Sequence, residues 1–419
     1  MALNFVWIAF FLIGFVVALV KLIVFHDYEI FKKLVDGIFD ASKSSVLDIA
    51  FPLTGVMVFF MGLLNIGEKA GAINFLSRIL NPFMKRLFPG VPEKHPAMGQ
   101  MVMNFSANML GLDNAATPFG LKAMESLQTL NPDKETATNA QIMFLVLHTS
   151  GLTLIPLSII AYRAGAGSTN PTSVFIPLML ATAIVTIVSI IVTGIYQRLK
   201  FDMVLIAWIV GIVAAISLFA GLIWQLPSQK DFATPVFLTK ETLSNVLGNI
   251  ILFTLIVAFL AGALVKKVNV FDAFIEGAKN GWDVIVKIIP YLVGMLVAIR
   301  VFRDSGSLQV VIDGLAWIFN SIGINADFVA ALPVAIMRPF SGGGARALML
   351  DVFKNNGPDS YVGQLASIFQ GSAESTFYIL ALYFGSVGIK KVRYAIWAGL
   401  ITDIIAIMTA IFIAHIFFK

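Results

Sequence analysis

Four short polar stretches interrupt long apolar segments of this sequence, at residues 113–118, 148–153, 341–346 and 370–376. They contain hydroxyl and amide side chains, glycines, one histidine, one arginine and two carboxylates. Groups of this kind, held in apolar surroundings, hydrogen-bond a small polar solute or coordinate an ion, and they let main-chain groups take part. The sequence therefore predicts a binding site built from these four stretches.

Two of the stretches have the composition of a half-helix that begins inside the protein. Ser341 is a good N-cap residue, and three glycines follow it, which allow a ligand to approach the backbone closely. In the stretch 113–118, we expect Thr117 to be the N-cap and Pro118 the first helical residue. Free N–H groups and the positive end of each helix would then point into the protein. The alternative is a pair of tight turns whose caps satisfy themselves.

The other two stretches contain glycine and hydroxyl residues within apolar runs, and Pro156 follows the first of them, which predicts locally unwound helices. Glu374 is the most informative residue, because a carboxylate within a membrane span is rare and is functional by default. Its alternative role is a structural ion pair with Arg338 or Arg346, arginines that would also favour an anionic ligand. Asp403, in the last apolar run, has no partner that the sequence identifies.

These interpretations give two residue sets. The predicted solute-binding residues are Asn114, Thr117, Ser341, Gly342, Gly343, Gly344, Arg346, Gln370, Ser372, Glu374 and Thr376. The predicted ion or proton site consists of His148, Thr149, Ser150, Thr153 and Glu374.

Signatures of enzymes and cofactors are missing from the sequence. The four histidines, at positions 26, 95, 148 and 415, do not have metal-ligand spacing, and there is no cysteine. No zinc-protease, serine-hydrolase or phosphate-loop motif occurs. We therefore expect neither an enzyme nor a cofactor or metal site.

The composition places these stretches in a membrane. Of 419 residues, 58% are hydrophobic and only 13% are charged, and the mean hydropathy is +0.88. A soluble domain carries about 25% charged residues, so a soluble enzyme and a nucleic-acid binder are excluded. The net charge of +5 comes from Lys and Arg in short loops, which set membrane topology. The sequence predicts an all-α polytopic membrane protein, whose first partner is the lipid bilayer.

About nine apolar runs are long enough to span a bilayer. They are residues 3–25, 46–66, 140–163, 174–198, 201–225, 243–265, 284–303, 362–385 and 392–417. The segments 97–131 and 325–354 are broken in the middle, and we expect them to be re-entrant hairpins. The alternative is a short loop between two surface helices. An amphipathic segment precedes each hairpin, at 68–88 and 307–322.

The order of elements then repeats, which predicts an internal duplication. The predicted domains are a first repeat at 1–200, a connector at 201–242 and a second repeat at 243–419. An ungapped alignment of 141–165 with 364–388 matches Gln141 with Gln364 and Thr153 with Thr376. Placing the basic loops in the cytoplasm puts the N-terminus inside and the two hairpins on opposite faces, an inverted repeat.

Several motifs resemble a known family. The segment 110–125, with Leu110-Gly111-Leu112-Asp113-Asn114-Ala115-Ala116-Thr117-Pro118, resembles the spore maturation protein A family. The segments 337–346 (Met-Arg-Pro-Phe-Ser-Gly-Gly-Gly-Ala-Arg), 357–360, 370–372 and 383–391 resemble spore maturation protein B. The chain looks like the two proteins fused, and both belong to the nucleoside-recognition, or Gate, family, distantly similar to concentrative nucleoside transporters. The resemblance implies a bacterial inner-membrane protein, and a link to spore maturation in bacteria that sporulate.

The sequence thus predicts a secondary-transporter-like protein of the bacterial inner (cytoplasmic) membrane. It would bind a small polar or anionic solute, nucleoside-like or an ion, at the midplane between two hairpins. Na⁺ and H⁺ are the candidate coupling ions, no nucleic acid is expected as a partner, and homo-oligomerisation stays open. The alternative is a membrane scaffold that does not transport and serves envelope, peptidoglycan or spore maturation.

Overall fold

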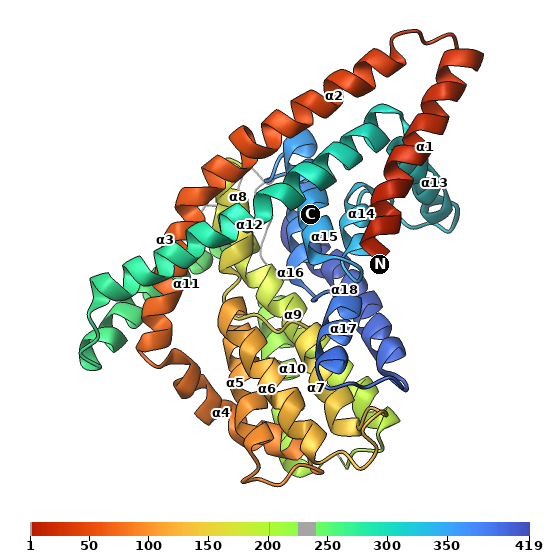
Figure 1. Cartoon of the computed structure of the whole chain (residues 1–419). Helices are drawn as coiled ribbons and strands as arrows, with labels where there is room; N and C mark the ends of the chain where they lie inside the picture. The colour runs from red at the N-terminus through yellow and green to blue at the C-terminus, as the bar shows by residue number, and fades with distance from the viewer. Residues whose placement is uncertain (1, 201, 225–239) are drawn as a thin grey trace.

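The computed structural model describes residues 2–200, 202–224 and 240–419, and every regular element in these ranges is a helix (Figure 1). The first half contains α1 (Ala2–Val24), α2 (Ile30–Ser44), α3 (Phe51–Lys69), α4 (Ala72–Leu87), α5 (Pro96–Met109), α6 (Asp113–Thr129), α7 (Asn139–Thr149), α8 (Leu157–Gly165) and α9 (Phe175–Tyr196). The rest contains α10 (Met203–Trp224), α11 (Lys240–Val265), α12 (Val270–Asp304), α13 (Ser307–Ser321), α14 (Leu332–Met337), α15 (Gly342–Asn356), α16 (Tyr361–Gly371), α17 (Thr376–Ser386) and α18 (Ala395–Phe418).

Among the described residues, six helical segments are long and apolar enough to cross a membrane, fewer than the nine apolar runs predicted. They are Asn4–Val24, Ile30–Lys69, Pro171–Tyr196, Val246–Val265, Val270–Asp304 and Ala395–Phe418. The runs 140–163 and 362–385 are each split into two short helices at their polar interruptions, and 201–225 corresponds to α10, described only in part. The all-α membrane class is confirmed, with about six long spans.

Two of the long segments join elements that the sequence analysis kept apart. A π-helical turn, Ser45–Ala50, links the amphipathic α2 to α3, so that 30–69 is one helix. α12 likewise combines a polar first half with the apolar run 284–303. The two long helices cross (Figure 1) at Gly277 and Gly281 of α12, where a Cβ on Gly277 would lie 2.5 Å from the Met61 carbonyl oxygen. Small residues four apart allow such close contact between helices in a membrane.

The order of elements repeats, as the sequence predicts. A long helix, an amphipathic helix, a helical hairpin, a split helix and a final helix occur in 30–196 and again in 270–418. The hairpins and split helices are joined by corresponding main-chain hydrogen bonds: Leu154 N–H donates to the Met109 carbonyl (2.8 Å), and Phe377 N–H donates to the Pro339 carbonyl (3.1 Å). The two halves therefore share one local architecture. The domain boundaries at 200 and 242 stay a prediction.

The turn of the first hairpin differs from the prediction. It lies at Leu110–Leu112, and α6 already begins at Asp113, so Thr117 is not the N-cap and Pro118 lies inside the helix. Gly111 makes the earlier turn because its φ of +71° suits glycine. A proline inside a helix lacks the N–H that would bond the carbonyl four residues earlier, so α6 contains Pro118 but loses one main-chain hydrogen bond. The arms are short: α5 extends about 21 Å at 1.5 Å per residue, less than a bilayer core of about 30 Å. That the hairpins re-enter a membrane stays a prediction.

The second hairpin turns where the sequence predicts. α15 begins at Gly342, and the Ser341 hydroxyl accepts a hydrogen bond from the Gly344 N–H at 3.0 Å. Its first arm, α14, has only six residues and extends about 9 Å. Ser341 is thus the N-cap of a half-helix that starts inside the protein.

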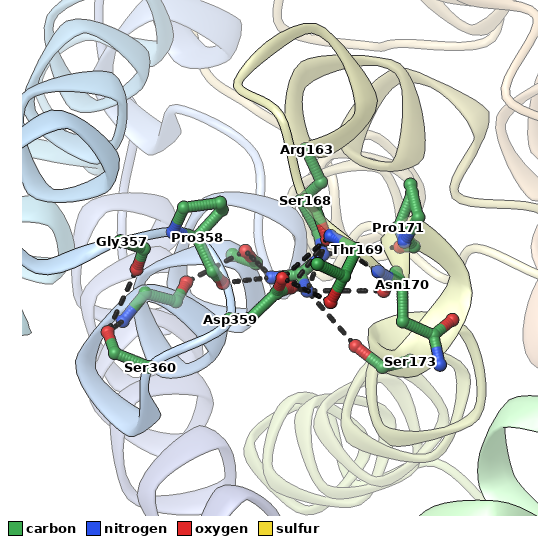
Figure 2. Close-up of polar contacts among 12 residues, drawn as sticks. Arg163, Ser168, Thr169, Asn170, Pro171, Ser173, Gly357, Pro358, Asp359 and Ser360 are labelled. Atoms are coloured by element: carbon green, nitrogen blue, oxygen red, sulfur yellow. Dashed lines mark hydrogen bonds and ion pairs between the residues drawn. The ribbon is translucent and has the colours of Figure 1, made fainter.

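Loops from the two halves meet at both ends of the bundle. At one end, Lys391 N–H donates to the Glu135 carbonyl at 2.9 Å, and Ala137 N–H donates to the Lys391 carbonyl at 3.0 Å. At the other end, Arg163 and Asp359 form an ion pair (Figure 2). The two halves are therefore joined by polar contacts at both ends of the bundle.

Candidate solute-binding site

The two split helices contact each other at their breaks. α7 ends at Thr149 and α8 begins at Leu157; α16 ends at Gly371 and α17 begins at Thr376. The Glu374 N–H donates to the Thr149 carbonyl at 2.8 Å, which joins one break to the other. Gly151 has a φ of +61°, and its Cβ would lie 3.5 Å from Ala373. The predicted unwinding at 148–153 and 370–376 is present in both halves.

The start of α7 and the start of α16 are fixed by side-chain caps. The Thr138 hydroxyl accepts from the Gln141 N–H at 3.2 Å, and the Gln141 amide oxygen accepts from the Thr138 N–H at 2.9 Å. The Ser360 hydroxyl accepts from the Gly363 N–H at 3.0 Å. These caps start each half-helix at a defined residue.

A cavity of about 470 Å³ lies where the breaks, the glycine tip and α12 meet. The predicted residues that line it are Thr153, Ser341, Gly342, Gly343, Arg346, Gln370 and Glu374. Its volume is in the range of small-molecule sites. The cavity thus brings together residues of three of the four polar stretches. Gly111, in the turn of the first hairpin, also lines it.

The glycine tip presents its backbone to this cavity. A Cβ on Gly343 would meet only the Ser341 hydroxyl, at 4.0 Å, whereas a Cβ on Gly342 would lie 2.7 Å from Arg338 Nη1. The Gln370 amide donates to the Gly342 carbonyl at 3.3 Å, while its own buried oxygen accepts no hydrogen bond from any described residue. The tip therefore has space beside Gly343 and a free acceptor on Gln370.

Glu374 has the arginine partner that the alternative interpretation predicted. Its carboxylate lies 3.3 Å from Arg338 Nη2, and Arg338 Nε donates to the Ala373 carbonyl at 2.6 Å. The Arg338 side chain is 9% exposed, whereas that of Glu374 is 41% exposed and lines the cavity. The pair places a carboxylate, already oriented by its arginine, on the cavity wall.

Arg346 supplies a second cation, and it makes no ion pair within the described residues. Its guanidinium lies 5.1 Å from the centre of the Tyr162 ring, and its buried Nε has no hydrogen-bond partner there. Because Arg338 is paired and Arg346 is not, the net charge of the cavity is positive. The N-terminal end of α15 adds to this preference for a negative group.

His148 lies behind the cavity in a buried polar cluster. Its Nδ1 is 2.8 Å from Asn108 Nδ2 and 3.1 Å from the Tyr383 hydroxyl. Asn104 contacts the same ring nitrogen and donates to the Ala116 carbonyl at 2.7 Å. Gly120 makes room for this cluster, because a Cβ there would lie 1.9 Å from the Tyr383 hydroxyl oxygen. The cluster links the first hairpin to α7 and α17.

The other predicted residues whose side chains the structure describes do not line the cavity. The hydroxyls of Thr149 and Ser150 donate to carbonyls three residues earlier, and that of Ser372 donates to Phe369 at 3.5 Å. Gly344 packs against Met337. Thr117 lies within α6, and the side chain of Asn114 is outside the described part of the chain. Whether these residues bind an ion stays a prediction.

Sequence reasoning missed several cavity residues, which are aromatic or amide: Asn108, Tyr162, Tyr291, Phe340 and Tyr378. Asn104 and Asn108 are four residues apart in an apolar helix, a spacing that puts both on one face and could have indicated the cluster. The aromatic residues give no comparable signal, since such residues are abundant along the chain.

The nucleoside-recognition (Gate) family matches residues 50–166 and 285–390, more than half of the chain. The chain belongs to the Gate family. Both matched segments of this Gate protein contain a hairpin and a split helix, so the match covers the two breaks and the glycine tip.

Two relatives from Bacillus subtilis (strain 168) are each similar to part of this Gate protein. It is 45% identical to spore maturation protein B over 164 residues, which are 39% of this chain and 90% of the relative. It is 39% identical to spore maturation protein A over 189 residues, 45% of this chain and 92% of the relative. Each relative is covered almost entirely by less than half of this chain, which is consistent with a fusion. The resemblance seen in the sequence is confirmed, and the chain is a multi-pass membrane protein.

Proposed function

We propose that this Gate protein binds a small anionic or polar solute in the cavity between its two broken helices. The proposal is carried by the convergence there of the N-terminal end of α15, the Arg338–Glu374 pair and Arg346, which has no ion pair among the described residues. Half-helices that begin at the membrane midplane are how secondary transporters hold anionic groups. We propose a transporter-like role without chemistry on the solute, coupled to Na⁺ or H⁺.

A nucleoside-like solute is the class that the lining favours. Aromatic rings of Tyr162, Phe340 and Tyr378 offer surfaces for stacking, and the amides of Asn108 and Gln370 offer hydrogen bonds. The test is thermal unfolding of the purified protein with nucleosides, nucleoside monophosphates, inorganic phosphate and Na⁺ or choline salts. Stabilisation by one class, saturating with concentration, is expected. If no compound stabilises the protein, the scaffold alternative gains and this proposal loses its basis.

Replacing Gly343 with valine is expected to abolish ligand-induced stabilisation and to leave expression and the ligand-free melting temperature unchanged. The side chain would enter the open space beside the tip, since only Ser341 lies within 4.0 Å. Stabilisation by a ligand at about 100 times its Kd, about 2.7 kcal/mol, would disappear. Gly55→Val is the matched control, because its Cβ also meets no neighbour but lies in α3, away from the cavity. A Gly343→Val protein that fails to fold would make the glycine structural.

We further propose that the membrane is the bacterial inner membrane, with the N-terminus in the cytoplasm. The chain has no cysteine, so single cysteines report topology directly. Cysteines at Lys85 and Lys390 are expected to resist an impermeant thiol reagent in intact cells, whereas one at Asn325 reacts. The reason is that Lys85 and Lys390 lie in loops rich in Lys and Arg, which are typical of the cytoplasmic side of a membrane protein. Labelling of Lys390→Cys with protection of Lys85→Cys would contradict the inverted repeat.

A further inference from the structure

Asp403 is a buried carboxylate that the solute cavity does not use. It lies in α18, inside an apolar spanning segment, and is 4% exposed. Neither of its oxygens makes a hydrogen bond to any described residue. Buried polar groups without a partner are rare in native structures, and an ionised carboxylate in such a place is strongly disfavoured. No hydrogen bond from the described part of the chain therefore neutralises Asp403.

Thr376, the first residue of α17, is a polar neighbour of Asp403. Its side chain packs on α18, because a Cβ on Gly399 would lie 2.3 Å from its methyl carbon. Thr376 is fully buried, and its hydroxyl also makes no hydrogen bond in the described structure. Two buried polar side chains thus face each other, each with unused hydrogen-bonding capacity.

The first half of the chain shows what a purely structural contact at this place looks like. Thr153, which aligns with Thr376, has its N–H 3.3 Å from the Thr182 hydroxyl of α9. That hydroxyl also donates to the Met179 carbonyl at 3.0 Å. Counted from the start of each final helix, Thr182 corresponds to Thr402, whose hydroxyl likewise donates to a main-chain carbonyl, that of Ala398, at 2.9 Å. Asp403 then corresponds to Ala183, so the carboxylate is an addition to this structural contact.

The charge on Asp403 acts on the solute cavity through one residue. α18 packs against α7, α9, α11, α16 and α17. The titratable side chains that the described parts of these helices carry are His148, Tyr196, Tyr361, Tyr378 and Tyr383. The cation that acts electrostatically on Asp403 is Arg338, which also pairs with Glu374 at 3.3 Å. A negative charge on Asp403 would thus compete with Glu374 for one guanidinium.

We propose that Asp403 is a proton-binding site that is separate from the solute cavity and coupled to it through Arg338. The carboxylic acid is neutral while the Arg338–Glu374 pair is intact. When its O–H bond breaks, the proton passes to water and the electron pair stays on the carboxylate, which then attracts Arg338 away from Glu374. A proton suits the site better than a metal cation, because the described side chains offer three oxygens, two from Asp403 and one from Thr376, fewer than the usual coordination of a hard cation. This proton site rests on the H⁺ alternative of the proposed function, but it requires no particular solute.

The test is infrared difference spectroscopy of the purified, solute-free protein between about pH 5 and about pH 9, which brackets the range in which a perturbed carboxyl titrates. We expect a protonated carboxylic acid signal that disappears at alkaline pH. Asp403→Asn should remove this signal completely and keep the fold, because asparagine is neutral and of the same size. Thr376→Val should keep the signal and shift its midpoint. Asp36→Asn, on the exposed side of α2, is the control and should change nothing.

Three results would overturn the proposal. Loss of the signal in Glu374→Gln rather than Asp403→Asn would assign the proton to the cavity carboxylate. A signal that persists at every pH would make the proton a fixed structural element. Stabilisation of the wild type by Na⁺ but not by choline, absent in Asp403→Asn, would assign the site to a sodium ion. Since no solute is added, failure of the proposed solute binding leaves this result intact.

Discussion

Replacing Arg163 with alanine is expected to lower the free energy of unfolding by about 1–3 kcal/mol, the cost of leaving a buried hydrogen-bonding group without its partner. Arg163 is fully buried at the end of α8 (Figure 2). Its guanidinium donates to the Asp359 carboxylate at 2.8 Å, to the Pro358 carbonyl at 2.6 Å and to the Ser173 hydroxyl at 3.0 Å. Alanine would remove this donor from all three acceptors, although Asp359 would keep its hydrogen bonds from Ser168 and Thr169.

The measurement is thermal and denaturant unfolding of Arg163→Ala in detergent. Arg78→Ala, an exposed arginine in α4 for which no ion pair is found among the described residues, is the control and should change stability little. The double variant Arg163→Ala/Asp359→Ala should recover part of the loss, because no unpaired carboxylate remains. A single variant as stable as the wild type would show that the cluster does not hold the two halves together.

The Arg163–Asp359 contact also has a defined pH dependence. Burial alone would raise the pKa of Asp359, but hydrogen bonds from Ser168 and Thr169 and the charge of Arg163 bring it below the ordinary value. A carboxyl with a lowered pKa contributes stability above its unfolded pKa of about 4, and this contribution is lost as the pH falls through the folded value. The difference between wild type and Asp359→Ala should therefore shrink in acid.

Replacing Arg346 with glutamine is expected to weaken binding of an anionic solute by about 10- to 150-fold, since a hydrogen bond to a charged group contributes about 1.5–3 kcal/mol. Arg346 is the cavity cation without an ion pair among the described residues, and it lies over the Tyr162 ring. Stability should change little, because no carboxylate loses its partner. A neutral nucleoside should lose less affinity than its monophosphate.

Titration of both compounds against Arg346→Gln measures this difference, with Arg78→Gln as the control for a general loss of positive charge. If the neutral and the anionic compound lose the same factor in affinity, the substitution acts through the shape of the cavity rather than through its charge. Unchanged binding of both would show that Arg346 does not contact the solute.

The sequence was informative where the signal is local. Ser341 before three glycines predicts the start of α15, and the glycine and hydroxyl residues at 148–153 and 370–376 predict the breaks, because each works through its own backbone preferences. The first hairpin turn was misplaced because two local signals compete there. Gly111 and Pro118 both suit a turn, and the packed structure uses Gly111.

The composition of the cavity lay beyond sequence reasoning, because tertiary contacts assemble it. Tyr291 on α12 and Tyr162 on α8 are far apart in the chain and meet only when the two halves pack. The number of spans stays a prediction for a related reason. Hydropathy counts apolar residues, and it does not distinguish a continuous helix from two short ones separated by an irregular segment.

The three hydrogen bonds that relate the two breaks and the two hairpins all join main-chain atoms: Glu374 to Thr149, Leu154 to Met109, and Phe377 to Pro339. Almost any residue can provide such a bond, so substitutions can accumulate in both halves without breaking it. This explains how the repeat persists with little remaining identity. It also predicts that the two halves of this chain, expressed as separate polypeptides, would form the same centre as a contact between subunits.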